Sequence, residues 1–198
     1  MARTRVIIDT DPGVDDAIAI LLALASPELD VLALTTVKGN AGLTGTTLNA
    51  RRLVSLAGRP DVIVAAGCDE AIAGPTEYSG TVHGVDGLGD LDWDEPNVAL
   101  HPRHAVDVMS ELIEAGPLSI VAIGPLTNLA VLLERYPGVE RGVEHVVVMG
   151  GASFEGNVTP ARVQRLGRPR GRAASVRCRV APHHHAPRPD PSGHPRRR

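Results

Sequence analysis

The sequence predicts an open α/β fold, a doubly wound and mainly parallel sheet that is incomplete at the C-terminus. Short β-branched runs alternate with helical patterns from residue 5 to residue 149, and this order is typical of parallel strands covered by helices. The 198 residues are 43% hydrophobic and only 2% aromatic, so Val, Ile, Leu and Ala must form the core. The length suits one such domain with a sizeable core.

The first part of the pattern contains three strands and two helices. Each expected strand is a short run of Val, Ile, Leu, Ala and Thr bounded by turn residues. The first helix begins at Asp15 or Asp16 and ends near Ala25, because Ser26 and Pro27 stop it. We expect strands at 5–8, 31–37 and 62–66, and the second helix at about 44–56.

The second part begins with a long connection at 67–97, rich in Gly, Asp and Pro. Connections of this length in compact domains are often functional. After it we expect helices at 104–115 and 125–135, and strands at 118–124 and 144–149. Ligands bind beyond the carboxyl ends of parallel strands. The loops expected to share that edge are 9–16, 38–40, 123–125 and 149–157.

Residues 162–198 differ from the rest of the chain. Residues 1–161 hold 22 acidic and 9 basic residues, a net charge of −13, whereas residues 162–198 hold 11 arginines and one acid, a net charge of +10. The second region has no apolar periodicity and is too poor in apolar residues to bury a core. We therefore divide the chain into the N-terminal part of an α/β domain at 1–161 and an Arg/Pro-rich tail at 162–198, expected to be disordered.

Cysteine and hydropathy patterns predict a cytoplasmic protein. Cys68 and Cys178 are too few for a disulfide framework or a zinc motif. No signal peptide is expected, because Asp9 and Asp11 interrupt the first apolar run. The run AIAILLALA is too short to span a membrane. The low aromatic content also argues against a nucleic-acid partner, which would be bound by base stacking.

Four acids, Asp9, Asp11, Asp15 and Asp16, surround the turn between the first strand and the first helix. One or two of them suit the helix dipole, but four repel one another unless a cation or a proton neutralises them. Oxygen-rich loops without sulfur favour Ca²⁺ or Mg²⁺. The spacing fits no EF-hand, and no Walker A or GxGxxG pattern is present. The DxD pair also resembles haloacid-dehalogenase phosphatases, in which Asp9 would be the nucleophile, although Gly13 and the two later acids depart from that pattern.

The stretch DTDPGVDDA at 9–17 resembles the signature of the inosine–uridine-preferring nucleoside hydrolase family. Matching stretches follow in the same order: TTVKGN at 35–40, VHG at 82–84, IGPLTNLA at 123–130 and VVVMGGASFEGNVTP at 146–160. The resemblance covers residues 4–160, about half of a typical family chain. It implies a nucleoside hydrolase-like α/β fold and Ca²⁺-dependent hydrolysis of the N-glycosidic bond of ribonucleosides in purine and pyrimidine salvage. It also implies a homodimer or homotetramer.

Motif positions carry the family's residue roles onto this chain. The resemblance implies that Asp11 is the general base and a Ca²⁺ ligand, that Asp16 is a Ca²⁺ ligand, and that Ile123 offers its backbone carbonyl to the ion. The remaining implied roles are ribose binding by Asp15 and Asn40, a sugar pocket lined by Met149 and Asn157, a base contact by His83, and support by Asp9. These roles suit a reaction whose transition state places positive charge on the sugar.

Several of these residues have simpler interpretations when each is considered alone. Asn40 suits a turn, His83 suits a hydrogen bond within a loop, and Met149 suits a core. Thr127 and Asn128 suit helix caps. Only the acid cluster would indicate a site without the other motifs.

The resemblance stops after residue 161. Family chains continue with a segment like AEFN, whose Glu and Asn bind ribose, and later carry a His-Asp pair for the leaving group and the ion. This chain instead has ARVQ at 161–164 and ends at Arg198. We expect the chain to have little or no activity. We also expect poor solubility, because missing strands and helices leave apolar surface uncovered.

The genetic code suggests a frameshift as the origin of residues 162–198. RVQRLGRPRGR at 162–172 is compatible with codons whose frame one base later reads EFNVWADPEAA, the kind of segment that the family expects. Ala186–Asp190 likewise is compatible with a hidden PLDLT. The alternative is a natural basic tail that binds nucleic acid or anionic surfaces.

Sequencing the gene around codon 161 tests the frameshift. We expect in-frame codons whose shifted frame reads EFN. Codons that exclude EFN would refute the frameshift, and salt-sensitive nucleic-acid binding that disappears on deletion of residues 162–198 would support the basic-tail alternative.

Overall fold

The computed structural model describes residues 2–70, 83–150 and 179–180. Within these residues one sheet has the strand order β3-β2-β1-β4-β5-β6, and all neighbouring pairs are parallel. The strands are β1 (Thr4–Thr10), β2 (Leu29–Thr36), β3 (Ile63–Ala66), β4 (Leu118–Ala122), β5 (Val143–Val148) and β6 (Arg179–Val180). The order reverses between β1 and β4, and such a switch point is where open α/β sheets bind ligands.

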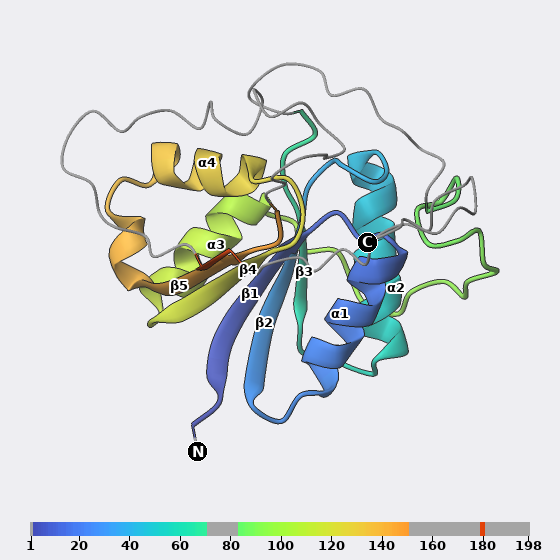
Figure 1. Ribbon diagram of the computed structural model, residues 1–198, viewed down its shortest axis with the longest axis horizontal. Helices are drawn as coiled ribbons and strands as arrows, with labels where there is room; N and C mark the ends of the chain where they lie inside the picture. Colours follow the sequence, from blue (N-terminus) through green and yellow to red (C-terminus); the bar gives the residue numbers. More distant parts are fainter. Residues whose placement is uncertain (1, 71–82, 151–178, 181–198) are drawn as a thin grey trace, which may run out of the picture.

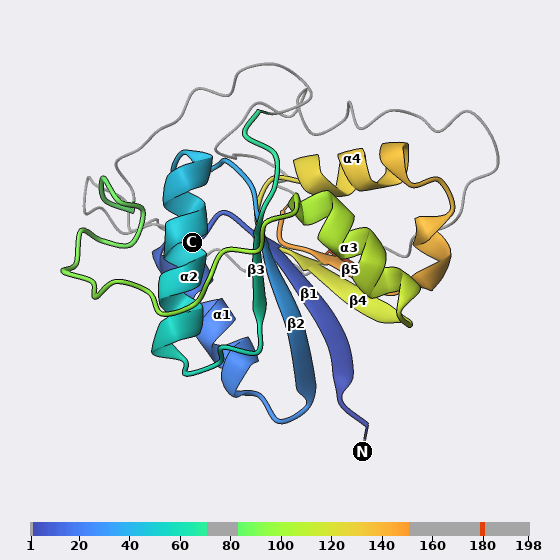
Figure 2. The same cartoon turned by 180° about the vertical axis from the view of Figure 1, so that it is seen from behind.

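Helices cover both faces of the sheet. They are α1 (Val14–Ala25), α2 (Leu43–Leu56), α3 (Ala105–Glu114) and α4 (Thr127–Arg135), with a short 3₁₀ helix η1 at Val139–Gly142. Figures 1 and 2 show α1 and α2 on one side of the strands and α3 and α4 on the other. The fold is therefore doubly wound, as the alternation of strand and helix patterns predicts.

The central strand β1 contributes to a core on each face. Val6 and Ile8 pack with Ile20 and Leu53 on the side of α1 and α2. Ile7 belongs to the other cluster, with α3 and α4. A strand that is buried on both faces needs apolar side chains on both of them. Its sequence is therefore a continuous apolar run and not an alternation of apolar and polar residues.

The elements expected from the sequence are present, and their bounds differ by at most two residues. The fold-class prediction is confirmed. The 3₁₀ helix η1 and the two-residue strand β6 were not expected, because neither has a periodic pattern. Within the long connection, residues 83–97 contain no helix or strand. Of the tail at 162–198 only Arg179 and Val180 are described, so its separation from residues 1–161 stays a prediction.

The apolar run near the start of the chain is expected from its sequence to be too short to span a membrane, which concerns the length and hydropathy of the helices. Among the described helices, none is long and apolar enough to cross a bilayer.

A matched pair of substitutions on α1 tests the packing of this layer. Leu24 is 5% exposed and lies in the core, whereas Leu22 on the same helix is 71% exposed. Leu24→Ala should lower the free energy of unfolding by about 2–5 kcal/mol, because it leaves a cavity. Leu22→Ala should change it by less than about 0.5 kcal/mol. Urea denaturation measures both, and equal losses would contradict the packing described for α1.

Candidate functional site

Loops from four strands meet at the carboxyl edge of the sheet. The N–H of Ile123 after β4 donates to the carbonyl of Asp9 in β1 at 2.9 Å. The N–H of Val37 after β2 donates to the carbonyl of Thr10 at 3.1 Å, and the N–H of Met149 after β5 donates to the carbonyl of Ala122 at 2.8 Å. These hydrogen bonds place the expected loops at one edge of the sheet. The loop after β5 is described only up to residue 150. Asn157 lies outside the described residues.

Asp11 is closely surrounded at this edge. Its Oδ2 accepts a 2.7 Å hydrogen bond from the N–H of Asn40. A Cβ on Gly39 would overlap the Asp11 carboxylate, and a Cβ on Gly124 would lie 2.7 Å from its Oδ1. Glycine at both positions therefore lets the two neighbouring loops close around this side chain, which is 6% exposed.

Asn40 joins Asp11 to Asp16. Its Nδ2 donates to the Asp11 backbone carbonyl at 2.9 Å and to Asp16 Oδ2 at 3.2 Å. Asp16 Oδ2 also accepts the N–H of Gly13 at 2.8 Å, which satisfies an otherwise free donor at the start of α1. Asn40 is thus more than a turn residue, because its backbone N–H holds the Asp11 carboxylate and its side chain holds the Asp16 carboxylate.

Asp9 is fully buried beside the other two acids. Its Oδ1 accepts hydrogen bonds from Thr35 Oγ1 at 2.6 Å and from Asn128 Nδ2 at 2.8 Å. Its Oδ2 has no hydrogen-bond partner among the described residues. The full burial of this side chain does not favour its use as the nucleophile of a phosphatase.

Asn128 is a positioning residue, although its place at the start of a helical pattern suggests only a helix cap. The N-cap of α4 is Leu126, and no side-chain hydrogen bond caps this helix. The Asn128 side chain instead bonds Asp9, donates to the Thr36 carbonyl at 3.0 Å and accepts the N–H of Cys68 at 2.9 Å. It therefore connects the ends of β1, β2 and β3 from the start of α4.

Burial raises the pKa of each inner carboxyl. The pKa of Asp11 rises to about 7, first because the group is buried and second because Asp16 lies close to it. The pKa of Asp9 rises to about 6 because burial outweighs its hydrogen bonds from Asn128 and Thr35. Burial also raises the pKa of Asp16 to about 6. Without a cation, these three groups resist carrying full negative charge at neutral pH.

His83 and Asp15 lie at the amino end of α1. His83 Nδ1 accepts the N–H of Val14 at 3.4 Å and is 3.9 Å from Asp15 Oδ1. Asp15 is exposed, in contrast to Asp16 beside it. Met149 is 41% exposed, so it is not a core residue. These side chains are accessible around the buried carboxylates.

The segment after His83 is attached to α2 by residues that the sequence analysis did not single out. Asn49 Nδ2 donates to the carbonyl of Asp86 at 2.8 Å. Arg52 lies 3.5 Å from the Asp86 carboxylate and 5.8 Å from the centre of the Trp93 ring. Asn49 is buried in the middle of α2. A polar residue at a core position of a helical pattern is therefore the sequence feature that could have indicated this role.

The donors at this edge suit a hard cation, but they do not complete a site. Asp11 and Asp16 have carboxylate oxygens here, and the backbone of Ile123 lies beside them through its N–H bond to the carbonyl of Asp9. Among the described residues, no group of three or more His, Cys, Asp or Glu side chains is arranged to hold a metal ion. A calcium ion would need six to eight oxygens, more than these residues provide.

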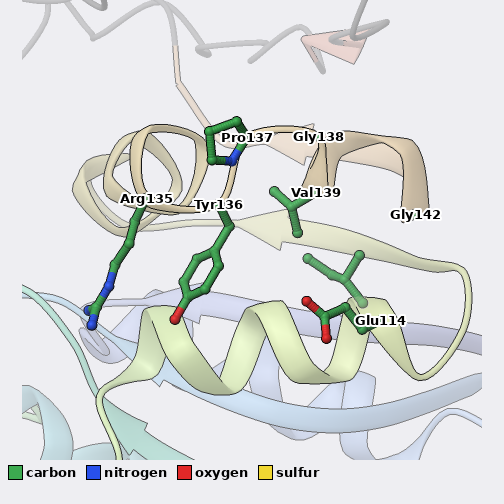
Figure 3. Close-up of a pocket in the computed structure, with 8 residues that line it drawn as sticks. Glu114, Arg135, Tyr136, Pro137, Gly138, Val139 and Gly142 are labelled. Atoms are coloured by element: carbon green, nitrogen blue, oxygen red, sulfur yellow. The ribbon is translucent and has the colours of Figure 1, made fainter.

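A separate hollow of about 480 Å³ lies between α3, α4 and η1. Figure 3 shows Glu114, Arg135, Tyr136 and Val139 around it. Glu114 and η1 precede β4 and β5, so the hollow lies at the amino ends of those strands, whereas the acidic loops lie at the carboxyl ends. It contains none of the expected site residues.

Comparison with known proteins identifies similar chains. The family model "Inosine-uridine preferring nucleoside hydrolase" matches residues 6–162. Uridine nucleosidase 1 of Arabidopsis thaliana is 44% identical over 161 residues, which cover 79% of this chain and 48% of that protein. Pyrimidine-specific ribonucleoside hydrolase RihA of Citrobacter koseri is also 44% identical, over 158 residues that cover 79% of this chain and 51% of RihA.

Solved structures agree with this similarity. The plant nucleoside hydrolase PpNRh1 matches with a TM-score of 0.70 and 41% identity, covering 75% of this chain and 48% of that chain. The purine-preferring ribonucleoside hydrolase of Gardnerella vaginalis matches with a TM-score of 0.71 and 33% identity, covering 75% and 49%. The chain thus spans about half the length of these proteins, and the family match ends where the Arg-rich region begins.

The raised pKa values predict how stability depends on pH in metal-free buffer. The folded pKa of Asp11, about 7, lies above its ordinary value of 3.8. The folded state therefore keeps a proton that the unfolded state has lost, and stability falls as pH rises from about 4 to about 7. The melting temperature should be lower at pH 7.5 than at pH 5.

Asp11→Asn should raise the melting temperature at pH 7.5 and weaken this dependence, because the neutral amide needs no proton. The exposed Asp94→Asn is the control and should leave the dependence unchanged. A melting temperature that rises with pH across the same interval would contradict the assignment.

Proposed function

The chain belongs to the inosine-uridine preferring nucleoside hydrolase family, and from this membership we propose that its acidic edge is half of a Ca²⁺-dependent ribonucleoside hydrolase site. The reaction adds water across the N-glycosidic bond and releases ribose and the free base. The observation that carries the proposal is the buried Asp11 carboxyl at the end of the central strand, with a pKa of about 7. Such a group exchanges a proton near neutral pH, as a general base must.

Asp11 would take the proton from the attacking water. The N–H of Asn40 and the two glycines beside Asp11 hold its carboxylate in one position, so little orientation is lost in reaching the transition state. Asp16 and the Ile123 carbonyl would hold Ca²⁺ together with Asp11. A bound cation supplies charge that lowers the pKa of water and relieves the repulsion among the carboxylates.

The outer residues would bind the nucleoside. Asp15 is exposed at the amino end of α1, where its carboxylate suits a ribose hydroxyl and the positive charge that develops on the sugar. We propose that Asn40 contacts ribose through the part of its amide not used by Asp11 and Asp16. Met149 and Asn157 would line the sugar pocket, and His83 would lie near the base. We place this activity in cytoplasmic purine and pyrimidine salvage, in a family-type homodimer or homotetramer.

The chain alone should have little or no turnover. It spans about half of its relatives, and the described residues offer too few oxygens for a complete calcium site. The proposed base and two carboxylate ligands belong to this half. The remaining ribose, leaving-group and ion contacts would come from the part of the relatives that lies outside the matched region. The site as it stands should therefore bind Ca²⁺ weakly and release base slowly.

Thermal unfolding at neutral pH with added Ca²⁺ tests the proposed site. Calcium should raise the melting temperature of the wild type, since a ligand that binds only the folded state stabilises it. Asp11→Asn and Asp16→Asn should remove this effect, whereas Asp94→Asn should retain it. An equal response in all four proteins would contradict binding at this edge.

A hydrolysis assay with inosine and uridine tests the expected activity. Release of base should be far slower than in full-length relatives assayed in parallel. Rates equal to those of the relatives would refute the proposal that this half is insufficient. Mg²⁺-dependent turnover of a phosphate ester, abolished by Asp9→Ala, would revive the phosphatase alternative.

A further inference from the structure

Residues 83–90 form a loop that closes on itself, which we call the His83 loop. The N–H of Gly89 donates to the carbonyl of His83 at 2.7 Å and joins the two ends. Asp86 Oδ1 accepts the N–H of Asp90 at 3.0 Å, and Asp90 Oδ1 accepts the N–H of Asp86 at 3.0 Å in return. Hydrogen bonds from aspartate side chains to nearby backbone hold a turn in one conformation without a helix or strand. The internal shape of the His83 loop is therefore fixed.

Two side chains of α2 hold this loop from outside. Asn49 Nδ2 donates to the carbonyl of Asp86 at 2.8 Å, and Arg52 Nη1 lies 3.5 Å from the Asp86 carboxylate. Arg52 Nη1 also donates to Asn49 Oδ1 at 3.3 Å. Since the amide oxygen accepts from the guanidinium, the amide nitrogen is directed to the loop. Asn49 is buried and the side chains of the ion pair are only 17% and 27% exposed, so water competes little with these contacts.

Asn49 also contacts the turn between β1 and α1 that carries the acids. Its Nδ2 donates to the carbonyl of Pro12 at 3.5 Å, beside its bond to the loop. Gly87 has a φ of 85°, and a Cβ there would lie 3.1 Å from Asn49 Nδ2 and 3.6 Å from the Pro12 carbonyl oxygen. Glycine at this position permits the close approach. One amide thus connects the His83 loop to the acidic turn.

The imidazole of His83 lies where these elements meet. A Cβ on Gly13 would lie 3.1 Å from both Cε1 and Nδ1 of His83, so the ring packs directly against this glycine. Nδ1 accepts the N–H of Val14 at 3.4 Å. A hydrogen bond of this length is weak and does not fix the ring by itself. The position of the ring therefore depends on contacts that hold the rest of its loop.

We propose that Asn49 and Arg52 are positioning residues, which hold Asp86 and thereby place the His83 imidazole beside Gly13. The closing bonds of the loop set its shape but not its distance from α1. Burial of Leu88 draws the loop inward, but apolar burial has no direction. Hydrogen bonds and a partly buried ion pair supply that direction. A contact between this imidazole and a nucleoside base rests on the proposed function, whereas the positioning does not.

NMR spectroscopy of the 198-residue chain tests the positioning. The wild type should show a nuclear Overhauser effect (NOE) between His83 Hε1 and Gly13 Hα, because the ring carbon lies against that glycine. His83→Gln assigns the ring signals. Arg52→Met keeps much of the side-chain packing and removes the charge. Asp86→Asn keeps an oxygen that accepts the N–H of Asp90 and removes the partner of Arg52. Each of these two variants should abolish the NOE.

Two further variants are the controls. Arg51 precedes Arg52 on the same helix, but its Nε donates to the carbonyl of Val98 at 2.7 Å, beyond the His83 loop. Arg51→Met should therefore retain the NOE. Arg52→Lys should also retain it, because a charged donor still faces Asp86. Circular dichroism should show all variants folded.

The outcomes separate the positioning from the proposed function. Absence of the NOE in the wild type, its retention in Arg52→Met or Asp86→Asn, or its loss in either control would each overturn the positioning. Inosine added with Ca²⁺ should shift the His83 ring signals of the wild type. Signals that do not shift would refute the base contact in the proposed function, and the NOE pattern would still decide the positioning.

Discussion

The burial of three carboxyl groups at the end of the central strand is the constraint on which the rest of the structure depends. Asp9, Asp11 and Asp16 lie where β1 meets α1, and burial raises the pKa of each. A fold tolerates such groups only if hydrogen bonds, protons or a cation offset the loss of water. Several polar residues around the edge serve this purpose. Thr35 and Asn128 donate to Asp9, and Asn40 donates to both of the other acids.

The requirements of these carboxyls explain features that are far apart in the sequence. Gly39 and Gly124 belong to different loops, but each lies against Asp11 closely enough that a Cβ would collide with it. Asn128 comes from α4 on one side of the sheet and reaches the ends of β1, β2 and β3. The loops thus pack closely around the acids, and the sheet and helices hold the loops in place. A site of this kind needs strands in parallel because only then do their ends meet.

The sequence predicts the elements well and their connections less well, for physical reasons. Strands such as β1 are buried on both faces and read as continuous apolar runs, and α1 is bounded by acids at one end and by Ser26 and Pro27 at the other. Strand order depends on pairing between residues such as Ile8 and Val121, and no local pattern encodes that pairing. The acid cluster was visible because its members are adjacent. Asn49 and Asn128 were missed as positioning residues because their partners come from distant parts of the chain.

Helix α1 connects the acidic site to exposed apolar side chains. Its first turn holds Asp15 and Asp16, and its N-cap N–H binds the Asp16 carboxylate. Its later turns carry Ile18 and Leu22, which are exposed. The same helix therefore carries both the buried and exposed carboxylates of the candidate site and apolar side chains that face solvent. A change in how α1 packs on the sheet would move the turn that presents these carboxylates, because each layer of side chains fits the next closely.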